Sequence, residues 1–192
     1  LTGDTEYILK NLAKIIQDKG IDRSKVFIAG FSSGAAMASN MASCFGDIFK
    51  GALIHSGLEF GAATSMGEAF TVMRSGPARK VEQSADLAYR CMKTHTAMIP
   101  VMVAHGASDS IVNPVNFNRI NKQFELLNQS IAKELGGQGK VTGLVKSRIT
   151  GPRLGAEVID ESIDGKLVVK SVLVDSMSHA WSGGDSAVQY SE

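Results

Sequence analysis

The stretch VFIAGFSSGAAMAS, residues 26–39, joins an apolar run to small residues at helical spacing through a turn of glycines and serines. The run predicts a buried strand, and residues 33–43 predict a helix. Glycines at 30 and 34 leave room where a β-carbon would clash. Gly-Phe-Ser-Ser-Gly fits the pattern G-x-S-x-G, a turn that lifts its central serine above a sheet edge. Ser32 is the nucleophile candidate, and the Ser33 backbone N–H is placed to hold an oxyanion. The alternative is a plain turn with a serine helix cap.

The rest of the chain predicts an α/β fold, with a mostly parallel sheet and flanking helices. Residues 51–57 and 100–106 are continuous apolar runs, typical of strands covered on both faces. Asp164-Gly165 lies between residues 157–162 and 166–175 and predicts a hairpin. We expect helices over residues 4–19, 78–92 and 116–135, and a surface loop over the glycine-rich residues 136–143. The first helix should place Ile8, Leu12, Ile15 and Ile16 on one face, with Asp4 or Thr5 as cap and Gly20 as stop.

Length and composition are those of one soluble domain, residues 1–192. The formal net charge of +1 gives no field that would favour nucleic acid or an anionic membrane. The longest apolar runs are too short to span a bilayer. The sequence has neither H-E-x-x-H nor a Walker pattern, and we expect no metal and no cofactor. Cys44 and Cys91 form either one disulfide or two free buried thiols.

A serine nucleophile needs a base, and the base needs a carboxylate that orients it. The expected chain order after a G-x-S-x-G turn is serine, acid, histidine. Asp109 follows the third predicted strand and His179 follows the last, so both should reach the same sheet edge as Ser32. Asp175 and Asp185 compete with Asp109 for the role of acid.

The other three histidines fit the role of base less well. His55 ends the second strand and reads as buried and structural, His95 as exposed, and His105 as a residue that orders the acid loop. Two aromatic residues lie next to the proposed site. Phe31 either lines the cleft or packs between strands, and Trp181 either forms a wall of a substrate pocket or anchors the last loop.

Five segments occur together in one order: AGFSSGAAMA, FKGALIHSGLEFGAA, MRSGP, PVMVAHGASDSIVNP and MSHAWSGG. Over residues 21–190 the chain resembles the polyhydroxybutyrate depolymerase family of esterases. This family belongs to the α/β hydrolases and is related to feruloyl and acetylxylan esterases. Ser178 stands where the family usually has glycine before the histidine.

The resemblance implies an α/β-hydrolase fold, with Ser32 as nucleophile, Asp109 as acid and His179 as base. It implies hydrolysis of polymeric or small esters of short hydroxy acids such as polyhydroxybutyrate, and a secreted or periplasmic protein. A carbohydrate esterase and a binding module without turnover are the alternatives. It also implies an earlier strand with a second oxyanion donor and a closing helix. We find neither and expect the domain to be truncated at both ends.

Overall fold

The computed structural model describes residues 3–151, 153–185, 187–188 and 190–191. Along the chain, its elements are α1 (Asp4–Lys19), η1 (Arg23–Lys25), β1 (Ile28–Phe31), α2 (Ser33–Cys44), β2 (Ala52–His55), α3 (Met66–Ser75), α4 (Val81–Met92), β3 (Val101–Gly106), α5 (Val115–Glu134), β4 (Val141–Ile149), β5 (Ala156–Ile163) and β6 (Lys166–Val174).

One mixed sheet organises these elements, in the order β1-β2-β3-β6-β5-β4. The first four strands in that order run parallel, and β5 and β4 continue the sheet as antiparallel strands. The register pairs Phe31 with His55 and His55 with Ala104, so the carboxyl ends of β1, β2 and β3 are level. The predicted α/β sheet and its parallel core are confirmed.

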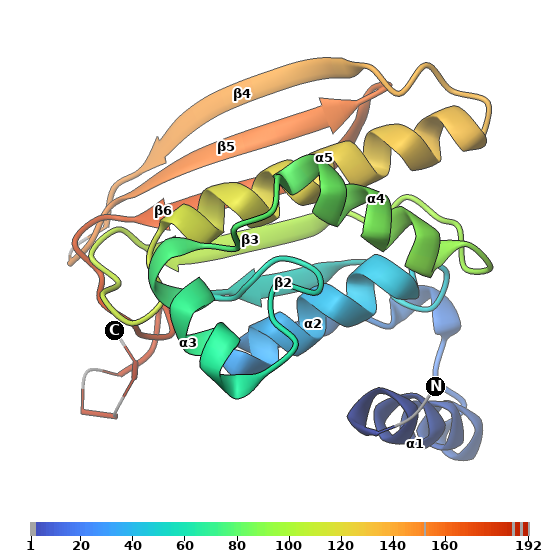
Figure 1. Ribbon diagram of the computed structural model, residues 1–192, viewed down its shortest axis with the longest axis horizontal. Helices are drawn as coiled ribbons and strands as arrows, with labels where there is room; N and C mark the ends of the chain where they lie inside the picture. Colours follow the sequence, from blue (N-terminus) through green and yellow to red (C-terminus); the bar gives the residue numbers. More distant parts are fainter. Residues whose placement is uncertain (1–2, 152, 186, 189, 192) are drawn as a thin grey trace.

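Helices α2, α4 and α5 lie together on one face of the sheet (Figure 1). Apolar side chains from both layers form the main core, among them Met41, Ile54, Val103, Phe124 and Leu127. A disulfide between Cys44 and Cys91 joins α2 to α4. Of the two alternatives for these cysteines, the disulfide is therefore confirmed and the pair of free thiols is wrong.

The expectation that strands β2 and β3 are covered on both faces is wrong at Met102 of β3, whereas the other residues of the two strands are buried or half-buried. Val101 and Val103 are buried, whereas Met102 between them is 39% exposed. The face of β3 that bears Met102 is therefore open at that position, although Ala104 on the same face is buried. A cavity of about 440 Å³ lies beside Met102, with Leu53 and Leu167 in its lining.

The structure differs from the sequence prediction in two further elements, β4 and α3, and in details of α1 and α4. Strand β4 begins at Val141, inside the predicted loop of residues 136–143, and continues to Ile149, and α3 lies within the insert between β2 and β3. Helix α4 begins at Val81 rather than 78. Gly3, not Asp4 or Thr5, is the N-cap of α1, while Gly20 ends that helix as predicted. Ile16 is buried but Ile15 is 53% exposed. Among the described residues, no helix is long and apolar enough to cross a membrane.

Candidate active site

The polar residues singled out in the sequence gather at the carboxyl ends of the parallel strands. Ser32 follows β1 directly, Asp109 lies three residues beyond β3, and His179 lies five residues beyond β6. Parallel strands in register bring these loops to the same edge, where open α/β sheets bind ligands.

Ser32 sits in a strained turn between β1 and α2. Its φ of 56° and ψ of −119° are unusual for a residue with a β-carbon. A β-carbon on Gly30 would collide with the backbone carbonyl of Gly34, so position 30 requires glycine. A β-carbon on Gly34 meets no described atom within 4 Å, so the steric reason given for that glycine is wrong.

The Asp109 carboxylate is fixed by the backbone of its own loop. Its Oδ1 accepts hydrogen bonds from the N–H groups of Ile111 (3.0 Å) and Val112 (2.8 Å). Its Oδ2 faces His179 Nδ1 at 2.8 Å. Asp109 is only 3% exposed. Its Oδ1 binds the backbone of the loop, and its Oδ2 faces the imidazole.

The His179 imidazole connects the carboxylate to the serine. A carboxylate can only accept hydrogen bonds. His179 Nδ1 therefore carries the proton, and its N–H donates a hydrogen bond to Asp109. Nε2 then presents its lone pair to Ser32 Oγ at 3.0 Å, the orientation that a general base needs. His179 is 8% exposed, and the three groups touch in series.

The loop that bears His179 packs closely on the loop that bears Asp109. The N–H of Ser108 donates to Met177 O at 3.0 Å, and that of Ala107 donates to Val174 O at 2.8 Å. A β-carbon on Gly106 would collide with the Met177 and Ser178 carbonyls, so glycine at 106 is what allows this approach.

The competing carboxylates Asp175 and Asp185, and His95, have partners outside the series of Ser32, His179 and Asp109. Asp175 pairs with Arg148, and Asp185 binds the N–H of Ala187. His95 is half-buried and contacts Asp47 at 2.9 Å, so the expectation that it is exposed holds only in part.

His105 orders the acid loop, as expected. Its Nε2 donates to Val112 O at 2.8 Å and lies 3.4 Å from Asp109 Oδ2. Burial is the main cause that lowers the pKa of His105, so its ring is held neutral.

Both aromatic candidates adjoin the imidazole system. Phe31 packs against His179, with 4.8 Å between ring centroids, and against Trp181 at 6.4 Å. Trp181 stacks on His55 at 5.2 Å and is 37% exposed. His55 itself is buried, as expected, but its contacts with the loop after His179 were not foreseen.

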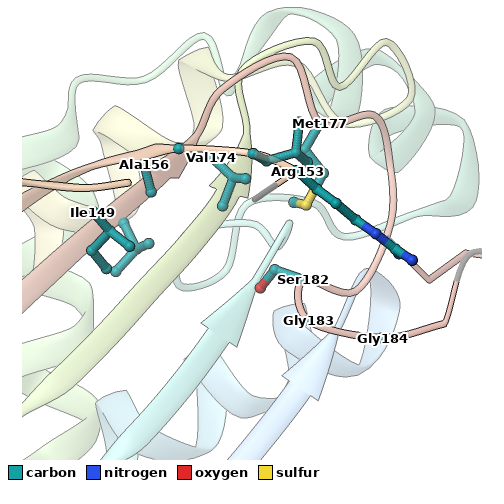
Figure 2. A pocket seen from close by; sticks show the side chains of 11 residues that line it. Ile149, Arg153, Ala156, Val174, Met177, Ser182, Gly183 and Gly184 are labelled. Carbon is teal, nitrogen blue, oxygen red and sulfur yellow. The ribbon is translucent and has the colours of Figure 1, made fainter. Parts of the chain in front are cut away.

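A cavity of about 760 Å³ is bordered by residues 182–184 of the loop that follows His179 (Figure 2). Its walls are mainly apolar, and Arg153 and Ser182 contribute polar groups. The lining residues are Ile149, Arg153, Leu154, Gly155, Ala156, Val172, Val174, Met177, Ser182, Gly183 and Gly184. No sequence pattern predicts this cavity, because strands β4, β5 and β6 and the last loop meet there only in the folded chain.

The sheet, the turn at Ser32 and the order of the three polar residues define an α/β hydrolase. The acetyl xylan esterase from Aspergillus awamori has the same fold, with a TM-score of 0.72 and 22% identity, over 92% of this chain and 62% of that one.

A sequence profile described as Esterase PHB depolymerase matches residues 2–147. The chain belongs to this family. It is 37% identical to poly(3-hydroxyalkanoate) depolymerase C of Paucimonas lemoignei over 105 residues, which cover 54% of this chain and 25% of that protein. Feruloyl esterase B of Thermothelomyces thermophilus is 25% identical over 142 residues, 70% of this chain and 49% of that protein. The chain thus spans between a quarter and half of these curated relatives.

Proposed function

We propose that residues 1–192 form one domain of a serine carboxylic ester hydrolase. The observation that carries this proposal is the series of contacts from Ser32 Oγ to His179 Nε2 at 3.0 Å and from His179 Nδ1 to Asp109 Oδ2 at 2.8 Å. A hydroxyl activated in this way is a nucleophile suited to acyl transfer.

In the proposed reaction, Ser32 Oγ attacks the ester carbonyl carbon while His179 Nε2 takes the hydroxyl proton. Asp109 stabilises the imidazolium that forms. The Ser33 N–H, in the first turn of α2 where it has no partner within the helix, donates to the oxyanion. His179 then protonates the departing alkoxide. The acyl group stays on Ser32 until water, activated by the same imidazole, releases the acid. These steps use side chains and backbone alone and need no cofactor.

The proposed substrates are polymeric or small esters of short hydroxy acids, such as polyhydroxybutyrate. The similarity to a poly(3-hydroxyalkanoate) depolymerase supports this class. Phe31 and Trp181 would line the acyl site beside the imidazole. A carbohydrate esterase of the feruloyl or acetylxylan type is the second candidate, supported by the similarity to feruloyl esterase B.

We further propose that the protein is secreted or periplasmic. The disulfide between Cys44 and Cys91 supports this location, because such bonds form and persist in oxidising compartments.

The proposal is tested with the full-length protein and its Ser32→Ala variant. We expect hydrolysis of p-nitrophenyl esters and labelling by a fluorophosphonate in the wild type, and loss of both in the variant. Equal rates in the two proteins would reject Ser32 as nucleophile. A folded wild type that neither labels nor hydrolyses would favour the binding module. A panel of hydroxybutyrate oligomers, acetylated sugars and feruloyl esters separates the two substrate classes.

A further inference from the structure

His55 lies between the proposed nucleophile and the last loop, although the reaction above does not use it. It is the final residue of β2 and is only 1% exposed. Its ring contacts Phe31 edge-on at 5.5 Å and stacks on Trp181 at 5.2 Å. A buried imidazole in this place has two nitrogens to satisfy.

The hydrogen bonds of His55 define its tautomer. The backbone N–H of Ser182 lies 3.1 Å from Nε2 and can only donate, so Nε2 must be the acceptor. Nδ1 therefore carries the proton, and its neighbour is Ser56 Oγ at 3.2 Å. Ser182 Oγ also lies 3.1 Å from Nε2. His55 is thus neutral while it holds the Ser182 backbone.

This contact completes a pair of ties on either side of the proposed base. Two residues before His179, Met177 O is held by the Ser108 N–H of the acid loop. Three residues after it, the Ser182 N–H is held by His55. The first tie fixes the imidazole against the carboxylate, and the second fixes it against the end of β2.

We propose that His55 is a positioning residue, which holds residues 179–182 so that His179 Nε2 stays aimed at Ser32. The proposal rests on the proposed esterase function. Since the Ser182 side chain also borders the large cavity, His55 sets the position of that wall as well (Figure 2).

The surroundings of His55 keep it in the accepting form. Burial, and then the nearby His105 and His179, lower the pKa of His55 to about 4, while the Asp109 carboxylate acts in the opposite direction. The acceptor is therefore retained throughout the neutral and mildly acidic range.

Two variants separate the acceptor from the ring. His55→Gln can keep an acceptor for the Ser182 N–H through its amide oxygen but loses the ring. His55→Phe keeps the ring against Trp181 but loses the acceptor. We expect His55→Phe to lower kcat for p-nitrophenyl acetate roughly five- to tenfold with little change in KM, and His55→Gln to restore most of that loss. His95→Phe, the same change at a histidine that packs on Phe45 away from the site, is the matched control and should retain wild-type kinetics.

Amide hydrogen exchange gives a readout that needs no activity. The Ser182 amide should be protected in the wild type and in His55→Gln, and should exchange faster in His55→Phe. Wild-type kcat in a folded His55→Phe protein, or equal Ser182 exchange in all three proteins, would overturn the inference. If His55→Phe does not fold, the ¹⁵N resonances of wild-type His55 decide. An unprotonated Nε2 between pH 6 and 8 supports the inference, and a protonated one overturns it. A wild type without esterase activity would reject the proposed function but leave the exchange and ¹⁵N results to judge this role.

Discussion

Replacing Asp109 by asparagine isolates the effect of the carboxylate on the imidazole. The asparagine Oδ1 can still accept from the N–H groups of Ile111 and Val112, so the acid loop keeps both backbone bonds. In the wild type, Asp109 Oδ2 lies 2.8 Å from His179 Nδ1. The amide NH₂ that replaces this oxygen cannot accept a hydrogen bond from Nδ1. The imidazole then favours a proton on Nε2, the nitrogen that faces Ser32, and loses its function as base.

The magnitude follows from this change of tautomer. In serine hydrolase triads, the same substitution with geometry intact lowers kcat roughly 10⁴-fold, about 5 kcal/mol of transition-state stabilisation. The free energy of unfolding should fall by no more than about 2 kcal/mol, since the hydrogen bond to a carboxylate is replaced by a neutral one, from the amide NH₂ to the unprotonated Nδ1.

The assay compares initial rates of p-nitrophenyl ester hydrolysis by the wild type and by Asp109→Asn, with thermal unfolding measured on each. Asp175→Asn is the matched control, because this carboxylate was the competing candidate and pairs with Arg148 at the surface instead. A folded Asp109→Asn protein with kcat within tenfold of an active wild type would refute the assignment of Asp109. A large loss in Asp175→Asn would point to the other carboxylate.

Two further predictions concern stability. Cys91→Ser removes a disulfide that joins residues 47 apart, and the entropy of the opened loop predicts a loss of about 4 kcal/mol in the free energy of unfolding, measured in urea; an unchanged urea midpoint would contradict it. Because folding lowers the pKa of His55 from 6.5 to about 4, only the unfolded chain gains a proton there as the pH falls between these values, so stability should decrease by at most about 3 kcal/mol over that window. The lowered pKa of buried His105 acts in the same direction. His55→Gln should flatten the profile in calorimetry at a series of pH values, and a slope equal to that of the wild type would exclude His55 as its source.

Missed elements show where sequence patterns give little information. Most residues of β4 are exposed, so the apolar alternation that marks a half-buried strand is weak there. It is an edge strand held by backbone pairing with β5, the next strand along the chain, and this pairing depends on backbone hydrogen bonds rather than on a side-chain pattern. For α3 a signal was present: Ser65 accepts from the Glu68 N–H, the S-x-x-E pattern of a helix start.

The sequence by itself determined the local features. The turn around Ser32 depends on residues adjacent in the chain, and the hairpin at Asp164-Gly165 depends on two residues that both adopt positive φ. Chain order after a G-x-S-x-G turn was enough to select Asp109 and His179 as candidates.

Only the tertiary structure decided which of these side chains touch. It brought His179 to Asp109 rather than Asp175, joined Cys44 to Cys91, and set His55 against the loop after the proposed base. These contacts join residues 47 to 127 positions apart. They depend on strand register and on the close approach of loops, which no local pattern of residues encodes.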